Sequence, residues 1–358
     1  MNAMLTRSYT IRFVTPAFLG NAEQSGQWRT PPIKALIRQW WRLVYAADSG
    51  ATLDVAAMRS AEGQLFGVAA DGEGSSRKSR VRIRLDAWSP GQLRSWDGLE
   101  QGTVHHRESE RTGYKVGPHA YLGYGPLDGR GGTDFSDKCN AAIKHGESAF
   151  LKLAFPGGEE APRLDTALSL LHRYGTLGGR SRNGWGSFSL TPADDVTPSF
   201  GAGLDARLTA PWQDALRLDW PHAIGRDATG PLIWQTEALA DWRAVMRRLA
   251  ELKIGLRTQF VFPDIRPPHL EPLDRHWLSY PVTNHKVSGW ERSNLRLPNS
   301  LRFKVRADGD GKLRGVVFHM PCLPPPKFNP DRGAIANVWR RVHEFLDQPA
   351  QKLERIPA

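Results

Sequence analysis

Cysteine is scarce in this sequence, and long apolar runs are absent. The 358 residues contain two cysteines, Cys139 and Cys322, which are too few for a disulfide framework or a cysteine-rich zinc site. No uncharged apolar run approaches the roughly 18 residues that a membrane-spanning helix needs. Residues 1–16 alternate polar and apolar side chains and lack the apolar core of a secretory signal. We therefore expect a cytoplasmic protein with no membrane partner.

Acidic residues are outnumbered by basic ones. The chain has 48 Lys and Arg but 37 Asp and Glu, which gives a net charge of +11 at pH 7. Such an excess attracts polyanions, and nucleic acid is the leading candidate because phosphates dominate these affinities. Charge alone gives equal weight to a basic surface that binds nothing. The 13 tryptophans slightly favour nucleic acid, since flat rings stack on unpaired bases, although most tryptophans are core residues.

The chain length and the hydrophobic pattern predict an α+β protein of two domains. In the first half the pattern gives the order strand, helix, strand, strand, helix, strand, which is that of a ferredoxin-like (βαββαβ) domain. The predicted strands are Tyr9–Val14, Arg77–Ala87, Glu147–Phe155 and one beginning at Phe188, and the predicted helices are Thr30–Ala47, with Thr30 as N-cap, and Leu164–Tyr174. Gly98–Cys139 is poor in periodicity, so we expect a long insertion or a mobile loop there.

The second half is predicted as a separate unit that follows a linker at Pro192–Gly203. Its expected elements are a helix at Thr236–Leu252, a hairpin of Leu301–Arg306 and Gly315–Met320, and a last helix at Ala334–Leu346. The predicted domains are therefore residues 1–192 and residues 204–358.

The densest local signal is the run Gly178-Gly179-Arg180-Ser181-Arg182-Asn183-Gly184-Trp185-Gly186. Its glycines allow a tight loop whose backbone N–H groups converge, and such concavities hold phosphates. Arg180 and Arg182 add forked donors that suit a phosphate. It is not a Walker A loop, because no Gly-Lys-Ser/Thr sequence ends it. The residues alone leave open a glycine-rich turn with incidental arginines.

A cationic stripe on the first predicted helix is a second candidate for nucleic-acid binding. Lys34, Arg38 and Arg42 are spaced four residues apart and share one face. Trp41 borders this face, and a tryptophan beside cations suits a phosphate backbone with a splayed base. The open alternative is an exposed amphipathic helix whose tryptophans belong to the core.

A third cationic group lies on the second predicted strand. Arg80, Arg82 and Arg84 alternate with aliphatic residues, which places three guanidinium groups on one face. Like charges on one face repel each other unless an anionic group lies across them, either acidic side chains or RNA. A solvated sheet face is the open alternative.

The evidence for catalysis is weaker than the evidence for binding. His105, His106 and His119 lie in the long insertion, where a histidine can act as a general base on a ribose 2′-hydroxyl. Isolated loop histidines are more often bystanders, and no paired-carboxylate or metal-ligand signature is present. We predict no catalytic residue, no metal and no cofactor, with a metal-independent RNA endonuclease as the rival function.

Three segments resemble a known family. They are Phe13–Gly20 with the following Pro31–Arg42, then Tyr121–Gly125, then the glycine-rich run Gly178–Gly186. The chain resembles the RAMP superfamily of CRISPR-associated proteins, whose common mark is a glycine-rich loop near the end of a ferredoxin-like domain. Within that superfamily the segments are similar to the first RAMP subunit of the Cmr, or type III-B, RNA-targeting complexes. Leu278–Val282 and Arg296–Arg302 extend the similarity into the second half.

The resemblance implies two ferredoxin-like, RRM-like RAMP domains in one chain. It also implies a non-catalytic RNA-binding subunit of a ribonucleoprotein, near the 3′ end of the guide RNA, that helps to capture complementary target RNA. The implied partners are guide RNA, target RNA and the other subunits of the Cmr complex. No second glycine-rich loop follows in residues 201–358, so every predicted RNA-binding residue lies in the first half.

Overall fold

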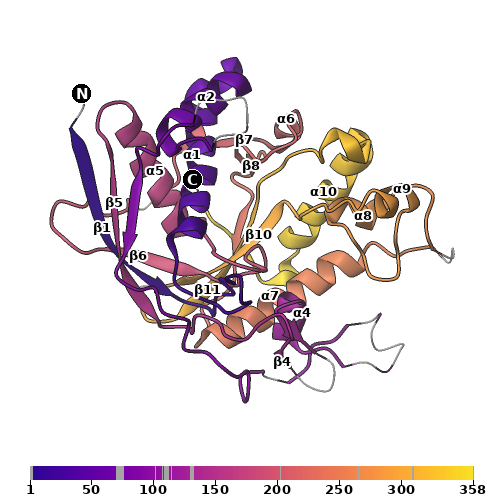
Figure 1. The fold of residues 1–358 in the computed structure, drawn as a ribbon. Coiled ribbons are helices and arrows are strands. Elements are labelled where there is room, and N and C mark those ends of the chain that lie inside the picture. Colours follow the sequence, from indigo (N-terminus) through magenta and orange to yellow (C-terminus); the bar gives the residue numbers. More distant parts are fainter. Residues whose placement is uncertain are drawn as a thin grey trace.

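Two four-stranded antiparallel sheets organise the protein (Figure 1). The structure is a computed structural model. It describes residues 3–69, 76–100, 102–106, 108, 113, 115–129, 133–201, 203–263, 267–308 and 310–357. Both sheets have helices packed on one face, so the molecule has a mixed α/β architecture.

The first sheet is built by the first half of the chain. Its elements are β1 (Met4–Phe13), α1 (Thr30–Ser49), β2 (Arg82–Leu85), β5 (Ser148–Pro156), α5 (Glu160–Tyr174) and β6 (Phe188–Pro192). The strands are ordered β2-β5-β1-β6, and all neighbours are antiparallel. Tyr9, Ile11 and Phe13 alternate along β1 and are buried in one cluster with side chains of α1 and α5. The order of elements is the predicted one, although β2 is much shorter than Arg77–Ala87.

The second half repeats this order on the second sheet. Its elements are β9 (Ile233–Gln235), α7 (Trp242–Thr258), β10 (Leu301–Ala307), β11 (Leu313–His319), α10 (Arg332–Asp347) and β12 (Glu354–Arg355). The strands are ordered β10-β11-β9-β12 and are again antiparallel. The predicted hairpin and the last helix are confirmed; Gly309 of the hairpin turn lies outside the described residues.

Two helix starts differ from the prediction. The helix expected at Thr236–Leu252 begins at Trp242, because the Asp241 side chain caps it by accepting from the N–H of Ala244 at 2.9 Å. Arg29, rather than Thr30, is the N-cap residue of α1, and no side chain caps that helix.

The segment predicted as a long insertion or a mobile loop contains elements that belong to the core. They are α4 (Pro118–Gly123), β3 (Leu127–Asp128) and β4 (Asp134–Phe135). Leu122, Leu127 and Cys139 are buried in one apolar cluster with side chains of the second half, and α4 packs on α7. The expectation of a mobile loop is therefore wrong for these residues, because burial rather than periodicity orders them.

The other elements lie in the connections between these strands and helices, and the hydrophobic pattern does not predict them. They are α2 (Val55–Phe66), β7 (Thr209–Pro211), α6 (Trp212–Ala215), β8 (Ile224–Arg226), α8 (Asp274–Leu278), α9 (Ser288–Arg292) and single 3₁₀ turns at Gly50–Thr52, Ala206–Leu208, Pro326–Phe328 and Pro349–Gln351. β7 and β8 form a two-stranded parallel sheet.

The two halves share their apolar cores. Ile233, Val316 and Phe318 of the second sheet pack in the cluster that contains the first sheet. Conversely, Phe18 and Trp185 of the first half pack in the cluster that surrounds α7 and α10. The predicted domain boundary at residues 192–204 stays a prediction, and the packing joins the halves across it.

Lys304 on β10 adds a polar link between the halves. Its buried ammonium group donates to three carbonyl oxygens of the first half, those of His172 at 2.6 Å, Gly175 at 2.8 Å and Phe188 at 2.9 Å. An ammonium group has three protons, so the three acceptors use all of them. Burial lowers the pKa of Lys304 well below its usual value.

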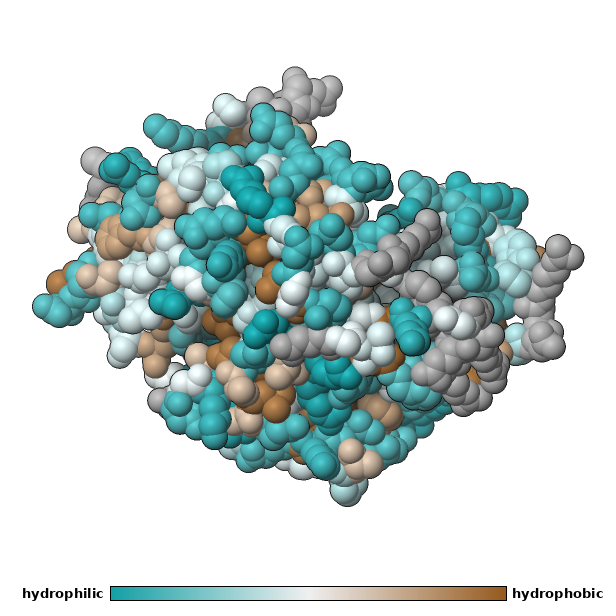
Figure 2. All heavy atoms as spheres, turned by 90° about the horizontal axis from the view of Figure 1, so that it is seen from below, coloured by the Kyte–Doolittle hydropathy of each residue, from teal (hydrophilic) through white to brown (hydrophobic). Residues whose placement is uncertain are grey.

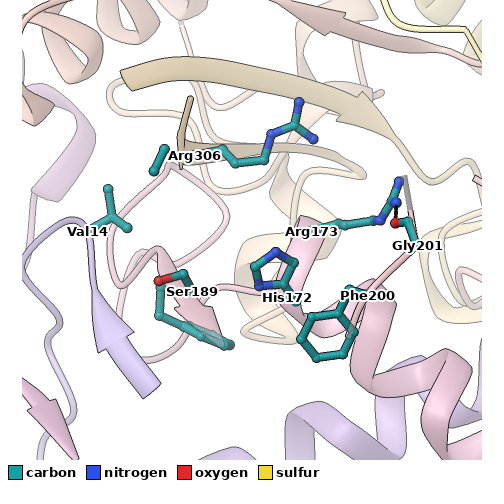
Figure 3. A pocket seen from close by; sticks show the side chains of 9 residues that line it. Val14, His172, Arg173, Ser189, Phe200, Gly201 and Arg306 are labelled. Atoms are coloured by element: carbon teal, nitrogen blue, oxygen red, sulfur yellow. Dashed lines mark hydrogen bonds between the residues drawn. The ribbon is translucent and has the colours of Figure 1, made fainter. Parts of the chain in front are cut away.

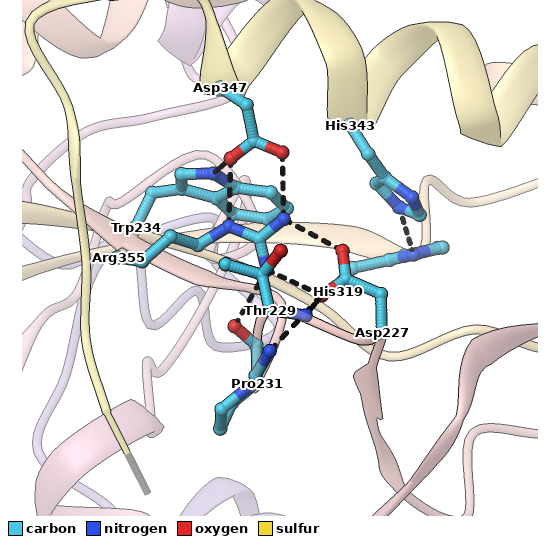
Figure 4. Close-up of polar contacts among 9 residues, drawn as sticks. Asp227, Thr229, Pro231, Trp234, His319, His343, Asp347 and Arg355 are labelled. Carbon is cyan, nitrogen blue, oxygen red and sulfur yellow. Dashed lines mark hydrogen bonds and ion pairs between the residues drawn. The ribbon is translucent and has the colours of Figure 1, made fainter.

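The short strand β12 is held against β9 by Arg355 (Figure 4). Its guanidinium group donates to Asp347 at 2.7 Å and to Asp227 at 2.8 Å, and it lies 4.5 Å from the centroid of the Trp234 ring. Burial alone would lower the pKa of Arg355, but the two carboxylates raise it overall. This cluster explains how a strand of two residues is fixed in place.

The face of the molecule seen from below in Figure 2 is mostly hydrophilic, and its apolar side chains form small separate patches. In the part of the chain that the structure describes, no helix has the length and apolar character needed to cross a bilayer.

Candidate nucleic-acid interface

The glycines of the run Gly178–Gly186 shape a loop that other residues cannot form. Gly178, Gly184 and Gly186 have φ angles of +97°, +92° and +65°, a region that side chains with a Cβ rarely adopt. A Cβ on Gly186 would also lie 1.8 Å from the carbonyl oxygen of Leu177. The prediction of a glycine-dependent loop is therefore confirmed.

The backbone N–H groups of this loop do not converge on an empty site. The N–H groups of four loop residues donate to carbonyls of the protein: Gly179 to Phe18, Asn183 to Arg180, Gly184 to Ser181 and Gly186 to Pro16. The prediction that the loop backbone forms a phosphate cradle is wrong for these groups, because internal hydrogen bonds use them. These four N–H groups are therefore not available to an anion.

The three segments that carry the family resemblance meet at this loop. The bridge between Phe18 and Gly179 joins the first segment to the loop. The Asn183 side chain donates to the carbonyl oxygen of Leu122 at 2.7 Å. The Arg180 guanidinium group lies directly over Gly125, where a Cβ would be 3.2 Å from Nη2. Segments that are far apart in the sequence thus form one structural unit.

A groove of about 1870 Å³ opens beside this unit. Its walls come from the glycine-rich loop, from α4, from the end of α7 and from residues 279–285 and 296–299 of the second half. The described lining contains six Arg or Lys residues, Arg180, Arg182, Lys253, Arg257, Arg275 and Arg296, and two carboxylates, Glu108 and Asp128. The groove therefore has a net positive lining.

Hydrogen bonds fix the cations of the groove in place. Lys253 donates to Asn183 Oδ1 at 2.7 Å, and Arg257 donates to the hydroxyl of Tyr121 at 3.2 Å. Burial, together with the charges of Arg257 and Arg180, lowers the pKa of Lys253 well below its usual value. Burial likewise lowers the pKa of Arg182. An anion in the groove would relieve this mutual repulsion.

One of the two carboxylates of the groove is already neutralised. Glu108 accepts two hydrogen bonds from the buried guanidinium group of Arg275, one of them at 3.0 Å. Burial alone would raise the pKa of Glu108, but Arg275 lowers it overall. Without this pair, five cationic residues and one carboxylate, Asp128, remain in the described lining.

Tyr124 supplies an aromatic surface at the groove. It is 60% exposed, which is unusual for a large aromatic side chain, and it lies in the segment Tyr121–Gly125 beside Arg180. Exposed aromatic rings next to cations stack unpaired bases.

Four of the predicted site residues line the groove: Arg180, Ser181, Arg182 and Asn183. Gly178, Gly179 and Gly184 are not among the residues that line it. Trp185 is fully buried and packs against Phe18, with ring centroids 5.2 Å apart. The prediction that Trp185 contacts RNA is wrong, because the ring anchors the loop in the core.

The cationic stripe of α1 faces α2 instead of the groove. Arg38 and Arg42 both donate to the buried carboxylate of Glu62 on α2, at 2.6 Å and 2.7 Å. The predicted shared face is confirmed, and burial lowers the pKa of Lys34. Figure 1 shows α2 at the top of the molecule and α4 at the bottom, so this stripe and the groove are far apart. RNA contact by the stripe stays a prediction.

Trp41 is not at the surface of that stripe. Its ring is fully buried, and its indole N–H donates to Glu160 on α5 at 2.9 Å. The prediction that Trp41 stacks on a base is wrong, because the ring fills the space between α1, α2 and α5.

The alternation predicted for the second strand is confirmed. Arg80, Arg82 and Arg84 are exposed, while Leu85 is buried. Arg84 is opposite Lys152 on β5, which places like charges side by side on the sheet face that α1 and α5 do not cover. RNA contact at this face stays a prediction.

The three histidines of the insertion have different surroundings. His119 has no exposed surface, and its Nδ1 lies 3.1 Å from Glu100. His106 lines the groove, and burial lowers its pKa. His105 is exposed and is not part of the groove lining. The structure does not test the rival function, in which one of these histidines acts as a general base.

Sequence reasoning missed the half of the groove that the second half of the chain supplies. The missed residues of the second half include Lys253, Arg257 and Arg296. Tyr124 of the first half also lines the groove and was not among the predicted site residues. The spacing of Lys253 and Arg257, four residues apart on one helix, was an available signal. Nothing local in the sequence places that helix beside the glycine-rich loop.

Comparisons with known proteins identify one matching family and several similar solved structures. The family model of the RAMP superfamily matches residues 10–189, which is half of the chain and includes the end of β1, all of α1, β5 and α5, and the glycine-rich loop. No curated protein matches the chain significantly. Among solved structures, the chain is similar to Cmr1 from Pyrococcus furiosus in its apo form, with 16% identity and a TM-score of 0.48 over 95% of this chain and 96% of that one. It is also similar to a chain of the type III-B Cmr-beta complex bound to cognate target RNA, with 12% identity and a TM-score of 0.48 over 95% of this chain and 100% of that one. The glycine-rich loop, the βαββαβ order of the first half that contains it, and the matching family model give one conclusion: the chain belongs to the RAMP superfamily.

Proposed function

We propose that this chain is a non-catalytic RNA-binding subunit of a type III-B CRISPR effector, the Cmr complex, and that single-stranded RNA lies in the groove. In this proposal the subunit sits near the 3′ end of the guide RNA, beside other Cmr subunits, and helps to capture complementary target RNA. The observation that carries it is the meeting of Arg180 and Arg182 with Lys253 and Arg257 in one groove.

The chemistry of the groove suits a single strand better than a duplex. Single-stranded nucleic acid is bound by a positive groove that follows the backbone and by aromatic rings on which bases stack. The groove has both, since six cationic residues and the exposed Tyr124 line it. Side chains that contact phosphates carry no sequence information, so we expect little sequence preference.

We also infer that the two sheets are two ferredoxin-like RAMP domains. Both have the order βαββαβ and the same spatial order of strands, second-third-first-fourth. The second domain contributes to the groove with the helix after its first strand, α7, rather than with a glycine-rich loop of its own.

We propose that RNA cleavage belongs to another subunit. His119 is buried and bound to Glu100, and the carboxylate nearest to His106, Glu108, is bound to Arg275. The isolated protein should therefore leave RNA intact with or without Mg²⁺. A metal-independent product that ends in a 2′,3′-cyclic phosphate and disappears in His106→Ala would support the rival endonuclease.

The test of RNA binding is a filter-binding titration with a short unstructured RNA at increasing salt. If four to six phosphates are neutralised, the log–log slope of affinity against salt is roughly −3 to −4, at about −0.7 per phosphate. The double variant Arg180→Ala with Arg182→Ala should bind more weakly and flatten the slope by roughly 1.4. A wild-type slope near zero would contradict the proposal.

A matched control separates the groove from general charge. Arg59→Ala with Arg340→Ala removes the same charge from exposed positions on α2 and α10 that do not line the groove. This variant should bind as the wild type does apart from a small change in slope. If both double variants behave alike, RNA is held by net charge and not by the groove. Melting curves of both variants show that the fold is kept.

A further inference from the structure

A second cationic cavity lies on the seam between the two halves, away from the groove. It has a volume of about 300 Å³ and shares no lining residue with the groove. His172 and Arg173 at the end of α5 and Ser189 on β6 line it from the first half. Arg306 at the end of β10 lines it from the second half. Figure 3 shows these four side chains around one space; we call it the seam pocket.

Cations converge on the seam pocket without a carboxylate in its lining. Arg306 is half-buried, and within the described part of the chain it makes no ion pair. Asp308, whose charge acts on Arg306, is bound to Arg314 at 2.6 Å. Arg173 donates one N–H to the carbonyl of Gly201, which leaves other donors of its fork for a ligand. Lys304 lies behind the pocket, where its ammonium group holds the carbonyls of His172 and Phe188.

The charges in the seam pocket act on one another. Burial lowers the pKa of Arg306; Tyr174 opposes this shift, and the charge of Arg173 adds to it. Burial and the charges of Lys304, Arg173 and Arg306 lower the pKa of His172 to about 4. Neighbouring charges of one sign in a half-buried space leave a positive potential that an anion would relieve.

His172 adds a neutral hydrogen-bond donor to the pocket. Its Nδ1 accepts a hydrogen bond from the backbone N–H of Leu190 at 3.0 Å. Because the ring is neutral near pH 7, its proton is then on Nε2. The ring is held by stacking on Phe200, with centroids 4.7 Å apart. The pocket therefore combines two forked guanidinium groups, one imidazole donor and the hydroxyl of Ser189.

We propose that the seam pocket binds a phosphate group, through Arg306 and Arg173 with support from His172 and Ser189. Arginine is suited to phosphate because its planar fork donates two parallel hydrogen bonds to the phosphate oxygens. The phosphate comes either from an RNA backbone or from a free phosphate or mononucleotide. The pocket opens beside the uncovered face of the first sheet, where Ser189 pairs in register with the exposed Arg12.

The experiment uses the full chain and three probes: inorganic phosphate, AMP and a short oligouridylate. Calorimetric titrations at low salt compare the wild type with Arg306→Gln, with Arg306→Lys and with Arg59→Gln. Arg59 is an exposed residue of α2, so its replacement removes the same charge elsewhere. Arg306→Gln should weaken binding of at least one probe about tenfold, as expected for a hydrogen bond between charged groups. Arg306→Lys should restore part of it, because it keeps the charge but loses the fork.

The pattern over the probes identifies the source of the phosphate. Saturable binding of phosphate or AMP that Arg306→Gln removes identifies a free ligand. A loss that is confined to the oligouridylate identifies the RNA backbone. If Arg306→Gln and Arg59→Gln bind all three probes alike, the proposal is overturned.

The proposal for the seam pocket and the proposal for the groove can be refuted independently of each other. Arg180→Ala with Arg182→Ala should weaken the oligouridylate and leave phosphate and AMP unchanged. If those groove variants lose RNA while Arg306→Gln does not, the seam pocket alone is refuted. Arg173→Gln repeats the test from the other half of the chain if Arg306→Gln melts at a lower temperature than the wild type.

Discussion

The ammonium group of Lys253 lies 2.7 Å from Asn183 Oδ1, and the charges of Arg257 and Arg180 act on it. Burial, followed by these two charges, lowers the pKa of Lys253 well below its usual value. In the free protein the Lys253 side chain therefore loses its proton at a lower pH than an ordinary lysine does. A phosphate in the groove favours the protonated form. RNA affinity should therefore fall as pH rises through the lowered pKa, by at most about tenfold per pH unit for one proton.

Fluorescence anisotropy at constant ionic strength measures this dependence. Lys253→Arg should bind RNA with a flatter pH profile, because arginine stays charged throughout. Lys152→Arg, an exposed position on β5 outside the groove, should keep the wild-type profile. A flat wild-type profile, or one that Lys253→Arg leaves unchanged, would show that Lys253 does not touch the phosphate.

The burial of two tryptophans on α1 could not be predicted from the local sequence. Trp40 and Trp41 are adjacent on α1, so their side chains point in directions about 100° apart, and both are fully buried. The reason is that α2 covers a second side of α1, and the sequence pattern does not predict α2 or its position. Exposure of a tryptophan thus depends on packing that is remote in sequence, whereas the cations of the glycine-rich loop are identifiable from local composition.

At the scale of elements, the pairing of α1 with α2 depends on one buried carboxylate. Glu62 is 3% exposed and accepts hydrogen bonds from Arg38 and from Arg42. Burial alone would raise the pKa of Glu62, but the two arginines lower it overall. A carboxylate with a lowered pKa stabilises the folded state above its unfolded pKa, about 4.3, and loses that contribution as pH falls through the folded pKa.

Glu62→Gln should lower the free energy of unfolding at neutral pH by about 1–3 kcal/mol. Removing one partner of a fully buried pair costs about 3–5 kcal/mol, but the side chains of Arg38 and Arg42 are 38% and 41% exposed, so solvent screens part of the interaction. Urea denaturation followed at neutral pH and near pH 4 measures the difference, which should shrink in acid. Glu344→Gln, an exposed position on α10, should change stability by less than about 0.5 kcal/mol. If Glu62→Gln and Glu344→Gln are equally stable at neutral pH, Glu62 does not stabilise the packing of α2 on α1.

Elements with a strong repeating pattern were predictable, and short ones were not. β1, α1, β5, α5 and the hairpin of β10 and β11 are long enough for their burial pattern to show in the sequence. β9 has three residues and β12 has two, so no periodicity exists to detect. Their places are fixed by pairing and by Arg355, which are contacts between distant segments. For this reason the βαββαβ order of the second half was visible only in part.

The same limit holds for the site at the scale of the whole molecule. The glycine-rich loop was identifiable because its composition is local, and it does line the groove with Arg180 and Arg182. Its partners Lys253 and Arg257 reach the groove only because the second half packs on the first. That packing is specified by two apolar clusters, each of which contains residues of both halves. Local sequence patterns predict that these residues are buried, but they do not predict which residues they contact.

The contribution of Lys304 to the packing of the two halves can be tested by substitution. Three buried carbonyl oxygens of the first half, those of His172, Gly175 and Phe188, accept from its ammonium group. Lys304→Met keeps a long unbranched side chain but leaves these acceptors without a donor, at a cost of about 1–3 kcal/mol for each acceptor that water does not reach. The removal of a buried charge offsets part of that cost, so we expect a net loss of at least about 2 kcal/mol.

The measurement for Lys304 is urea denaturation followed by tryptophan fluorescence, because buried tryptophans of both halves report on it, among them Trp41 and Trp234. Lys312→Met makes the same chemical change at an exposed position of the hairpin turn and should shift the midpoint very little. Since His172 and Phe188 also line the seam pocket, the loss of the Lys304 contacts should loosen the wall of that pocket that the first half supplies. If Lys304→Met and Lys312→Met have the same midpoint, the three carbonyls find other partners, and the apolar clusters alone hold the halves together.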